Sequence, residues 1–249
     1  EIGIFSSMRV GTGLGGSSTF TVSLIKGLST FVGKRLDKQE VAELACEIEI
    51  DILKEPIGKQ DQYAAAIGGF NVFQFNPGGK VDTEPVMLNY KTRLDLEKNI
   101  LVFFTGITRA ANSVLSEQKA KSATNEKSLN SLVQMVKIFQ KKLLSGNFKG
   151  MGEMLHESWL IKKKLASKIS NGAIDQLYSA GIKNGAWGGK VLGAGGGGCV
   201  MFLGPEKNHV KIRQALQKKA QELKLTDFKE VPIKFVHSGV EIVSNTWSN

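Results

Sequence analysis

Two glycine-rich stretches constrain what this chain of 249 residues can fold into. The first is GTGLGGSS at residues 11–18, and the second is LGAGGGG at residues 192–198. Glycine has no Cβ atom, so such a stretch can turn its amide N–H groups inward and approach an oxyanion closely. Between the two stretches stands an isolated Asp61, in the sequence KQDQ at residues 59–62. Two glycine-rich loops and one aspartate indicate phosphoryl transfer, with polyphosphate as the bound group.

The first stretch leads into a helical pattern. The apolar residues that follow have helical spacing and are Leu24, Ile25, Leu28, Phe31 and Val32. Ser17 or Ser18 can cap this helix, which would turn its free N–H groups and positive dipole end toward the anion in the glycine loop. Hydroxyl groups at this position can also reach a Mg²⁺ ion.

Other interpretations of the first stretch have to be weighed. Gly11, Gly13 and Gly16 also satisfy the dinucleotide-binding spacing, which needs an acid at the end of a later strand. Asp37 has about the right separation, but Glu40 follows it in a capping-box pattern, which indicates a helix N-cap. A P-loop would have lysine where Ser17 stands. A glycine turn that merely enters a helix stays open as the simplest alternative.

The second stretch leads into the apolar run CVMFL at residues 199–203, which is typical of a buried strand. A run of glycines inside a compact domain is entropically unfavourable if it serves only as a linker. We therefore expect its backbone to approach a ligand or another loop closely.

The order of GLGGSS, KQDQY and LGAGGGG resembles that of the GHMP small-molecule kinases, and the resemblance covers nearly the whole chain. Within that superfamily, GKQDQYAA, GGFN, LHESW and GGKVL are most similar to the D-glycero-D-manno-heptose 7-phosphate kinases. The resemblance implies an α+β, two-domain GHMP-kinase fold. Its N-terminal domain would be ribosomal-protein-S5-like and incomplete here, covering residues 1–95, and its C-terminal domain would be ferredoxin-like, covering residues 96–249.

The resemblance also implies roles for individual residues. The residues that would wrap the phosphates of ATP are Gly11, Gly13, Leu14, Gly15, Gly16, Ser17 and Ser18. Ser17 and Glu49 would bind Mg²⁺. Asp61 would be the catalytic acid, and because a lysine stands close to it, we expect it to stay ionised and orient the acceptor hydroxyl. Lys59 would supply a cation to the reaction.

The acceptor is expected to be a sugar phosphate, which cations and hydroxyl donors must hold. Thr108 and Arg109 follow a strand-like run at residues 100–104, where loops often carry function. The substrate-binding residues predicted here are Gln60, Thr108, Arg109, Gly195 and Gly196. His156 and the lysine run at residues 162–164 are further candidates that rank below Arg109.

The sequence departs from the family in two places. Gly16 stands where the family has serine, so one hydroxyl is lost. The family's first motif precedes the phosphate loop by about a hundred residues, whereas here the loop begins at Gly11 and the chain opens with EIGIF, which resembles the middle of a strand. We therefore expect an N-terminal segment to be missing.

Composition limits the remaining function classes. The formal charge of +10 suits anionic substrates, and no RNA-binding motif or aromatic-interleaved basic stripe is present, so nucleic acid is not expected as a partner. Cys46 and Cys199 do not form a disulfide framework and are expected to be reduced and buried. The three histidines lack zinc-ligand spacing. We expect no membrane partner and a cytoplasmic enzyme, with a homodimer left open.

The coarse pattern of elements is α+β. Strands are predicted at residues 70–75, 100–104, around 199 and at 233–236. Helices are predicted at about 127–144, 150–168, 173–183 and 207–223, and the division between domains is expected near residues 89–97.

The leading hypothesis is an ATP- and Mg²⁺-dependent kinase of the anomeric hydroxyl of D-glycero-D-manno-heptose 7-phosphate, giving the 1,7-bisphosphate for lipopolysaccharide or capsule precursors. The alternatives are another GHMP kinase (of fucose, galactose or an isoprenoid alcohol), a dinucleotide-dependent oxidoreductase, and a noncatalytic nucleotide-binding protein.

Overall fold

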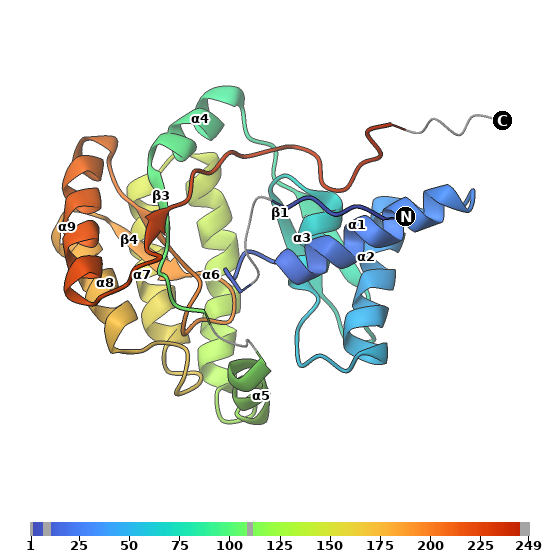
Figure 1. The fold of residues 1–249 in the computed structure, drawn as a ribbon, viewed down its shortest axis with the longest axis horizontal. Coiled ribbons are helices and arrows are strands. Elements are labelled where there is room, and N and C mark those ends of the chain that lie inside the picture. Colours follow the sequence, from blue (N-terminus) through green and yellow to red (C-terminus); the bar gives the residue numbers. More distant parts are fainter. Residues whose placement is uncertain (1, 7–10, 109–111, 245–249) are drawn as a thin grey trace. The chain divides into compact units, whose positions relative to one another are not determined.

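The computed structural model describes residues 2–6, 11–108 and 112–244 (Figure 1). The chain divides into two compact units, one made of residues 15–87 with the segment from 235 onward, the other of the residues up to 14 with residues 88–234. Both combine helices with antiparallel strands, which confirms the predicted α+β class.

The unit around residues 15–87 consists of helices followed by a hairpin. Its elements are α1 (Gly16–Phe31), α2 (Lys38–Cys46), the π-helical segment η1 (Glu47–Ile52), α3 (Gln60–Ile67), β1 (Asn71–Phe75) and β2 (Val81–Pro85). The hairpin is antiparallel and pairs Asn71 with Pro85 and Phe75 with Val81.

The core of this unit forms between α1, α2 and α3, from buried residues including Val22, Ile25, Val41 and Tyr63. The Tyr63 ring meets that of Phe73 edge-on, with 5.9 Å between centroids, which ties α3 to the hairpin. The capping box predicted at Asp37 and Glu40 is confirmed, since each side chain accepts from the other residue's backbone N–H.

The other unit carries a sheet with most of its helices inserted between the first two strands. Its elements are α4 (Tyr90–Lys98), β3 (Ile100–Phe104), α5 (Asn112–Ala120), α6 (Glu126–Leu144), α7 (Phe148–Lys162), α8 (Gly172–Lys183), β4 (Gly188–Val191), β5 (Cys199–Leu203), η2 (Glu206–Asn208), α9 (His209–Glu222) and β6 (Lys229–Glu230). The strand order is β4-β5-β3-β6, antiparallel throughout. Strand, helices, two strands, helix and strand is the ferredoxin-like succession that was predicted.

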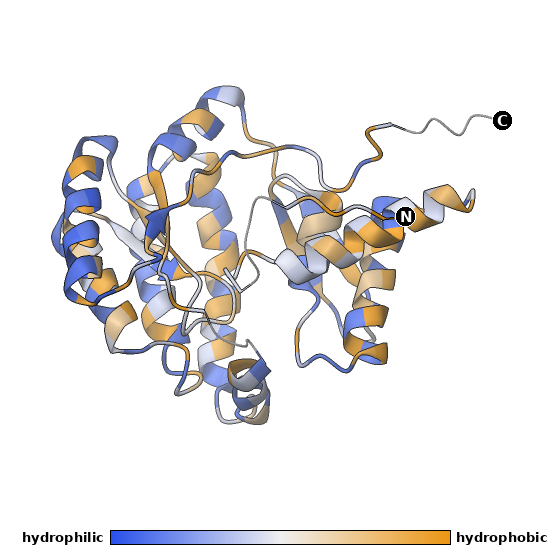
Figure 2. Ribbon diagram, viewed as in Figure 1, coloured by the Kyte–Doolittle hydropathy of each residue, from blue (hydrophilic) through white to orange (hydrophobic). Residues whose placement is uncertain are grey.

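One face of this sheet forms the larger core. Val200 and Phe202 of β5 pack with Leu177 of α8 and Leu216 of α9, and all four are fully buried. Figure 2 shows the matching division of hydrophobic and hydrophilic residues around α9, because only one side of that helix meets the sheet.

Three predicted elements differ from the structure. Residues 233–236 are not a strand: β6 lies earlier, and Pro232, which has no N–H to donate, follows the last paired residue, Val231. Residues 2–6 have no regular secondary structure. Helix α7 ends at Lys162 and not near residue 168.

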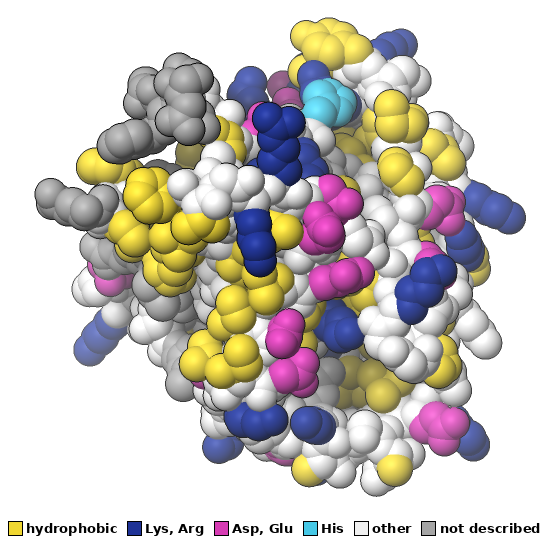
Figure 3. Space-filling model, turned by 90° about the vertical axis from the view of Figure 1, so that its right-hand side faces the viewer, with side chains coloured by type: hydrophobic (Ala, Val, Ile, Leu, Met, Phe, Trp, Pro, Cys, Tyr) yellow, Lys and Arg dark blue, Asp and Glu magenta, His cyan; other side chains and the backbone are white. Residues whose placement is uncertain are grey.

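The proposed domain boundary at 95/96 stays a prediction, whereas the compact units change over at 14/15, 87/88 and 234/235. Figure 3 shows one face of the molecule, on which hydrophobic side chains gather beside acidic and basic ones. No helix in the described ranges is long and apolar enough to cross a membrane.

Candidate active site

Helix α1 begins within the first glycine stretch, at Gly16. Its N-cap is Gly15, in the left-handed conformation with φ 69°, and no side chain caps the helix. The prediction that Ser17 or Ser18 caps it is therefore wrong, because the helix begins at Gly16 and both serines lie inside its first turn. The N–H groups of the first turn thus have no side-chain cap, and together with the helix dipole they favour an anion at this end.

The carboxylate of Glu49 is the centre of a buried hydrogen-bond network. Its Oε1 accepts from Ser17 Oγ at 2.8 Å and from Thr21 Oγ1 at 3.2 Å. Its Oε2 accepts from Ser18 Oγ at 2.8 Å and from Gln62 Nε2 at 2.5 Å. Glu49 is only 2% exposed, so these four donors replace the water that an ionised carboxylate requires.

The backbone explains how Glu49 reaches α1. It lies on η1, the π-helical segment that continues α2, and π-helical turns often occur at functional sites. The neighbouring Gln62 is completely buried in α3, and its Oε1 has no hydrogen-bond partner within the described part of the chain. Its Nε2 faces the carboxylate, which fixes the orientation of the amide.

Ser17 and Glu49, predicted from the resemblance to bind Mg²⁺, are brought together. Their contacting atoms, Ser17 Oγ and Glu49 Oε1, are hard oxygen donors of the kind that Mg²⁺ takes. The described residues contain no group of three or more His, Cys, Asp or Glu that could hold a metal. The pair therefore fits an ion that has few protein ligands and takes its others from phosphate and water.

Asp61 lies where the N-termini of two helices meet. It is in the first turn of α3, and a Cβ built on Gly15, the N-cap of α1, would stand 3.5 Å from its Cγ. Helix N-termini favour a negatively charged side chain at this position. The close approach also explains the glycine at position 15, since its positive φ and the nearby carboxylate both disfavour a side chain.

Lys59 and Gln60 stand just ahead of Asp61. Lys59 is the N-cap of α3, and its Nζ donates to Gly79 O at 2.9 Å in the β1–β2 turn. Gln60 is exposed at the first position of the helix. Their proposed roles at the reaction centre and in substrate binding stay predictions.

The second glycine stretch packs against the beginning of the first, as its composition led us to expect. A Cβ on Gly193 would lie 2.8 Å from Gly13 Cα, and one on Gly13 would lie 2.8 Å from Leu192 O. Cys199 N also donates to Thr12 O at 2.8 Å. The two backbones meet so closely that only glycine fits at the contact.

Side chains and loops anchor the second stretch. Thr105 Oγ1, fully buried after β3, donates to Gly198 O at 2.8 Å. Gly196 N donates to Ile169 O at 2.6 Å, and Asn171 Nδ2 donates to Gly196 O at 3.1 Å. Both backbone groups of Gly196 are therefore engaged within the fold.

The remaining predicted substrate residues are placed as follows. A Cβ on Gly11 would lie 3.6 Å from Thr108 Cβ, so Thr108 lies beside the start of the first stretch. Gly195 is buried against Ile169. Arg109 lies outside the described residues. The substrate roles of Thr108, Arg109, Gly195 and Gly196 stay predictions.

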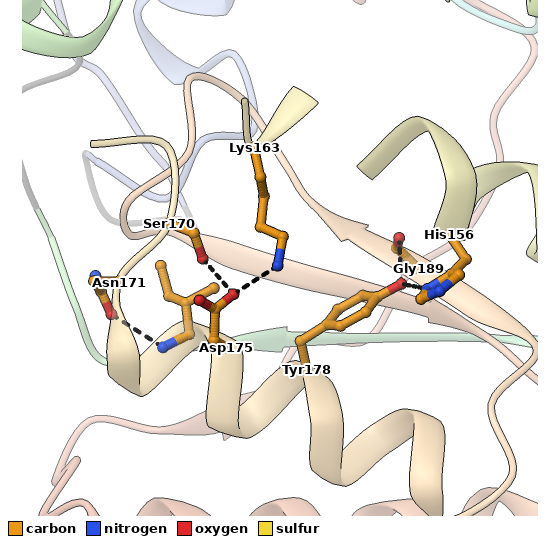
Figure 4. A network of polar contacts seen from close by, with 8 residues as sticks. His156, Lys163, Ser170, Asn171, Asp175, Tyr178 and Gly189 are labelled. Carbon is orange, nitrogen blue, oxygen red and sulfur yellow. Dashed lines mark hydrogen bonds and ion pairs between the residues drawn. The ribbon is translucent and has the colours of Figure 1, made fainter. Parts of the chain in front are cut away.

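The polar network of Figure 4 links α7 and α8 to β4. Tyr178 Oη donates to Gly189 O at 3.1 Å, so it accepts from Nδ1 of His156, 2.8 Å away. Burial raises the pKa of Tyr178. On the next residue of β4, burial lowers the pKa of the Lys190 ammonium.

Sequence reasoning missed several functional partners. Thr21 and Gln62, which support Glu49, and Thr105, which anchors the second stretch, were not singled out. A signal existed for Gln62, which neighbours Asp61 and lies four residues before the equally buried Ala66 on one helix face. Nothing local marks Thr21 or Thr105, because their partners are 28 and 93 residues away.

Comparison with known proteins identifies the family of the chain. The family model for the GHMP kinases N terminal domain matches residues 1–69, and the model for the GHMP kinases C terminal domain matches residues 139–222. The chain belongs to the GHMP kinase family. Membership confirms the resemblance inferred from the glycine stretches and Asp61.

Individual GHMP kinases are similar over most of the chain. It is 35% identical to the D-glycero-alpha-D-manno-heptose 7-phosphate kinase of Campylobacter jejuni, over 86% of this chain and 64% of the relative. It is 28% identical to the mevalonate kinase of Thermococcus sibiricus, over 83% of this chain and 60% of the relative. It thus spans less than two thirds of both.

A solved structure has the same fold. The crystal structure of a D-glycero-D-manno-heptose 1-phosphate kinase from Bacteroides thetaiotaomicron is 26% identical and has a TM-score of 0.66, covering 96% of this chain and 67% of that one. The GHMP kinase fold predicted from the sequence is therefore confirmed.

Proposed function

We propose that this GHMP kinase transfers the γ-phosphoryl group of ATP to the anomeric hydroxyl of a manno-heptose 7-phosphate. The observation that carries the proposal is the convergence on the α1 N-terminus of Ser17, Glu49 and Asp61. An anion-binding helix end, a pair of magnesium-type oxygen ligands and a carboxylate are the parts that phosphoryl transfer needs.

Polyphosphate would bind at the N-terminus of α1, where the first-turn N–H groups have no side-chain cap. Ser17 Oγ and Glu49 would hold Mg²⁺, which neutralises charge on the transferring phosphoryl group when bound. Ser18, Thr21 and Gln62 hold the Glu49 carboxylate in place, so its position does not depend on the ligand.

Asp61 would accept a hydrogen bond from the acceptor hydroxyl and aim that oxygen at the γ-phosphorus. As the new O–P bond forms and the bond to the β-phosphate oxygen breaks, the hydroxyl proton passes to the carboxylate and ADP leaves. Positioning the acceptor hydroxyl is a further contribution of the carboxylate.

The acceptor assignment rests on the relatives. The Campylobacter jejuni relative is named for heptose 7-phosphate and the Bacteroides thetaiotaomicron structure for heptose 1-phosphate. A phosphorylated heptose is the shared chemistry, and the 7-phosphate is favoured because that relative is the more similar of the two.

The test is ADP release from MgATP with heptose 7-phosphate, heptose 1-phosphate, fucose, galactose and mevalonate as acceptors. We expect turnover with heptose 7-phosphate above all others. The Asp61→Asn variant should lose about 10²-fold or more in kcat, since it keeps the size of the side chain but cannot take the proton.

The matched control is Asp51→Asn, which changes an exposed carboxylate on the same unit. It should leave turnover within about twofold. Turnover that survives Asp61→Asn would reject the assigned role, and preference for mevalonate or a free sugar would reject the acceptor. Binding of ATP with no turnover on any acceptor would reject catalysis by this chain.

A further inference from the structure

A groove lies between α8 and α9, on the unit that carries the four-stranded sheet. Its volume is about 610 Å³, and small-molecule sites typically have about 300–1,000 Å³. All of its lining residues fall within 176–222, so the groove belongs to one compact unit and shares no residue with the kinase site. We propose that this groove binds a small molecule with two phosphate groups and no aromatic ring.

Two helices that run in opposite directions form the groove (Figure 1). Asn208 Nδ2, at the start of α9, donates to Gly185 O at 3.1 Å, just after the end of α8. Each helix lines the groove with residues at helical spacing, beside the stripe that it buries against the sheet. Ala180 and Ala215 stand near the middle of the two lining stripes, and their short side chains leave room for a ligand.

The groove has more positive than negative groups, since four lysines and one glutamate line it. The glutamate is Glu222, to which Lys219 donates a hydrogen bond. That bond, with a further contribution from Lys218, lowers the pKa of the Glu222 carboxyl. Within the described part of the chain, neither Lys183 nor Lys211 forms an ion pair. The one acid of the groove therefore leaves two of the cations unneutralised.

Lys183 and Lys211 stand at the same end of the groove, because the end of α8 lies beside the start of α9. Lys183 is in the last turn of α8, where the helix dipole favours a cation. Lys211 is in the first turn of α9, where the dipole disfavours one, and that turn has no acidic residue. A bound phosphate would supply the negative charge that this end of the groove lacks.

A second cation lies farther along the same helix. Lys218 follows Lys211 by two turns of α9, which is about 10 Å along the axis. Between the two ends, Gln176, Ser179 and Gln214 offer neutral hydrogen-bonding groups. A small molecule with a phosphate at each end and hydroxyl groups between them matches this order of side chains.

The composition of the lining argues against other ligands. Among the described residues that line the groove, none is aromatic and none is arginine. A nucleotide base would have no ring on which to stack, and an acidic protein would lack the tryptophan, tyrosine and arginine anchors typical of protein interfaces. The groove therefore favours a bisphosphorylated small molecule over a nucleotide or an acidic protein.

The experiment titrates the full chain with fructose 1,6-bisphosphate and follows binding by calorimetry. Mg²⁺ and a saturating non-hydrolysable ATP analogue are present, so that the nucleotide site of the proposed function is filled. Parallel titrations use fructose 6-phosphate, which has one phosphate, and polyglutamate, which stands for an acidic protein segment.

Three variants alter the groove. The double variant Lys183→Gln/Lys211→Gln removes its two unneutralised charges, and Lys183→Arg/Lys211→Arg keeps them. Ala215→Leu keeps every charge but fills the space. The matched control is Lys127→Gln/Lys141→Gln, which removes the same charge from two exposed positions of α6. Circular dichroism shows whether each variant is folded.

We expect the bisphosphate to bind the unsubstituted chain more tightly than either parallel ligand. The double glutamine variant and Ala215→Leu should each weaken its binding about tenfold or more. The double arginine variant and the α6 control should stay within about twofold of the unsubstituted chain.

Several results would overturn the proposal. An equal loss in the α6 control would show that only the overall positive charge attracts the ligand. Unchanged affinity in folded Ala215→Leu would show that the ligand does not enter the groove. Fructose 6-phosphate bound as tightly as the bisphosphate, polyglutamate bound in its place, or no binding of the bisphosphate would each reject the ligand class. Phosphoryl transfer is not measured here, so this proposal and the kinase assignment fail independently.

Discussion

Removing the Glu49 carboxylate should destabilise the unit around α1 far more than removing a neighbouring acid. In Glu49→Ala, Ser18 Oγ and Gln62 Nε2 lose their acceptor. An unsatisfied buried polar group costs about 1–3 kcal/mol, so the two together cost about 2–6 kcal/mol. Ser17 and Thr21 are nearer the solvent and add less, since water can replace the carboxylate there.

Two further variants divide this free energy. Glu49→Gln keeps the side-chain volume and one acceptor oxygen but turns an NH₂ group toward two of the donors. We therefore expect its free energy of unfolding to fall by about 1–3 kcal/mol. Glu47→Ala removes an exposed carboxylate from the same π-helical segment and should change stability by less than about 0.5 kcal/mol.

The assay is urea unfolding followed by circular dichroism, with the free energies of unfolding compared across the four proteins. Adding MgATP extends the comparison, because Glu49→Gln should also lose the stabilisation by ligand that the unsubstituted chain shows. A Glu49→Ala variant no less stable than Glu47→Ala would refute the view that this carboxylate organises the helix terminus.

The remaining predictions concern the glycine contact, the half-buried Lys190 and the thiols. Gly193→Ala should lower the free energy of unfolding by about 1–3 kcal/mol more than Gly33→Ala does. Both glycines have positive φ, but only at Gly193 would a Cβ meet a neighbouring backbone. Equal decreases in the free energy of urea unfolding for the two variants would argue against the contact. Lys190→Met should raise the free energy of unfolding at neutral pH. Burial lowers the pKa of Lys190 in the folded state, so the unsubstituted chain should become more stable as pH rises toward the ordinary lysine value of about 10.5. Thermal melts taken across that pH range should not show this gain for Lys190→Met. Cys46 and Cys199 are buried, and burial raises the pKa of each thiol to about 11, so a thiol reagent at pH 7 should react with neither until urea unfolds the chain; rapid labelling of the native protein would contradict this.

Local signals predicted most of the secondary structure. The capping box at Asp37 and Glu40 was correct because it is decided within a few residues. The strand predicted at residues 233–236 was wrong because the pairing with β3 lies earlier, at residues 229–231, and the proline at 232 ends it before the apolar run. Leu28, Phe31 and Val32 marked α1 by their spacing, yet all three are exposed, so helical spacing alone did not give the core.

The candidate site was only partly predictable. The glycine stretches, Ser17, Glu49 and Asp61 could be named because family motifs mark them. The capping role of the serines was wrong because the helix begins at Gly16, one residue earlier, and their hydroxyls donate instead to Glu49, 32 and 31 residues away. The contact of Thr105 depends on long-range packing, which no spacing rule encodes.

The most direct test of phosphoryl transfer follows the phosphorus atom itself. ³¹P NMR of MgATP with heptose 7-phosphate should show the γ-phosphate signal replaced by an anomeric sugar phosphate with this chain, and no more than a trace of that product with Asp61→Asn over the same time. Free inorganic phosphate in place of the sugar phosphate, or the same product formed at an undiminished rate by Asp61→Asn, would contradict the account.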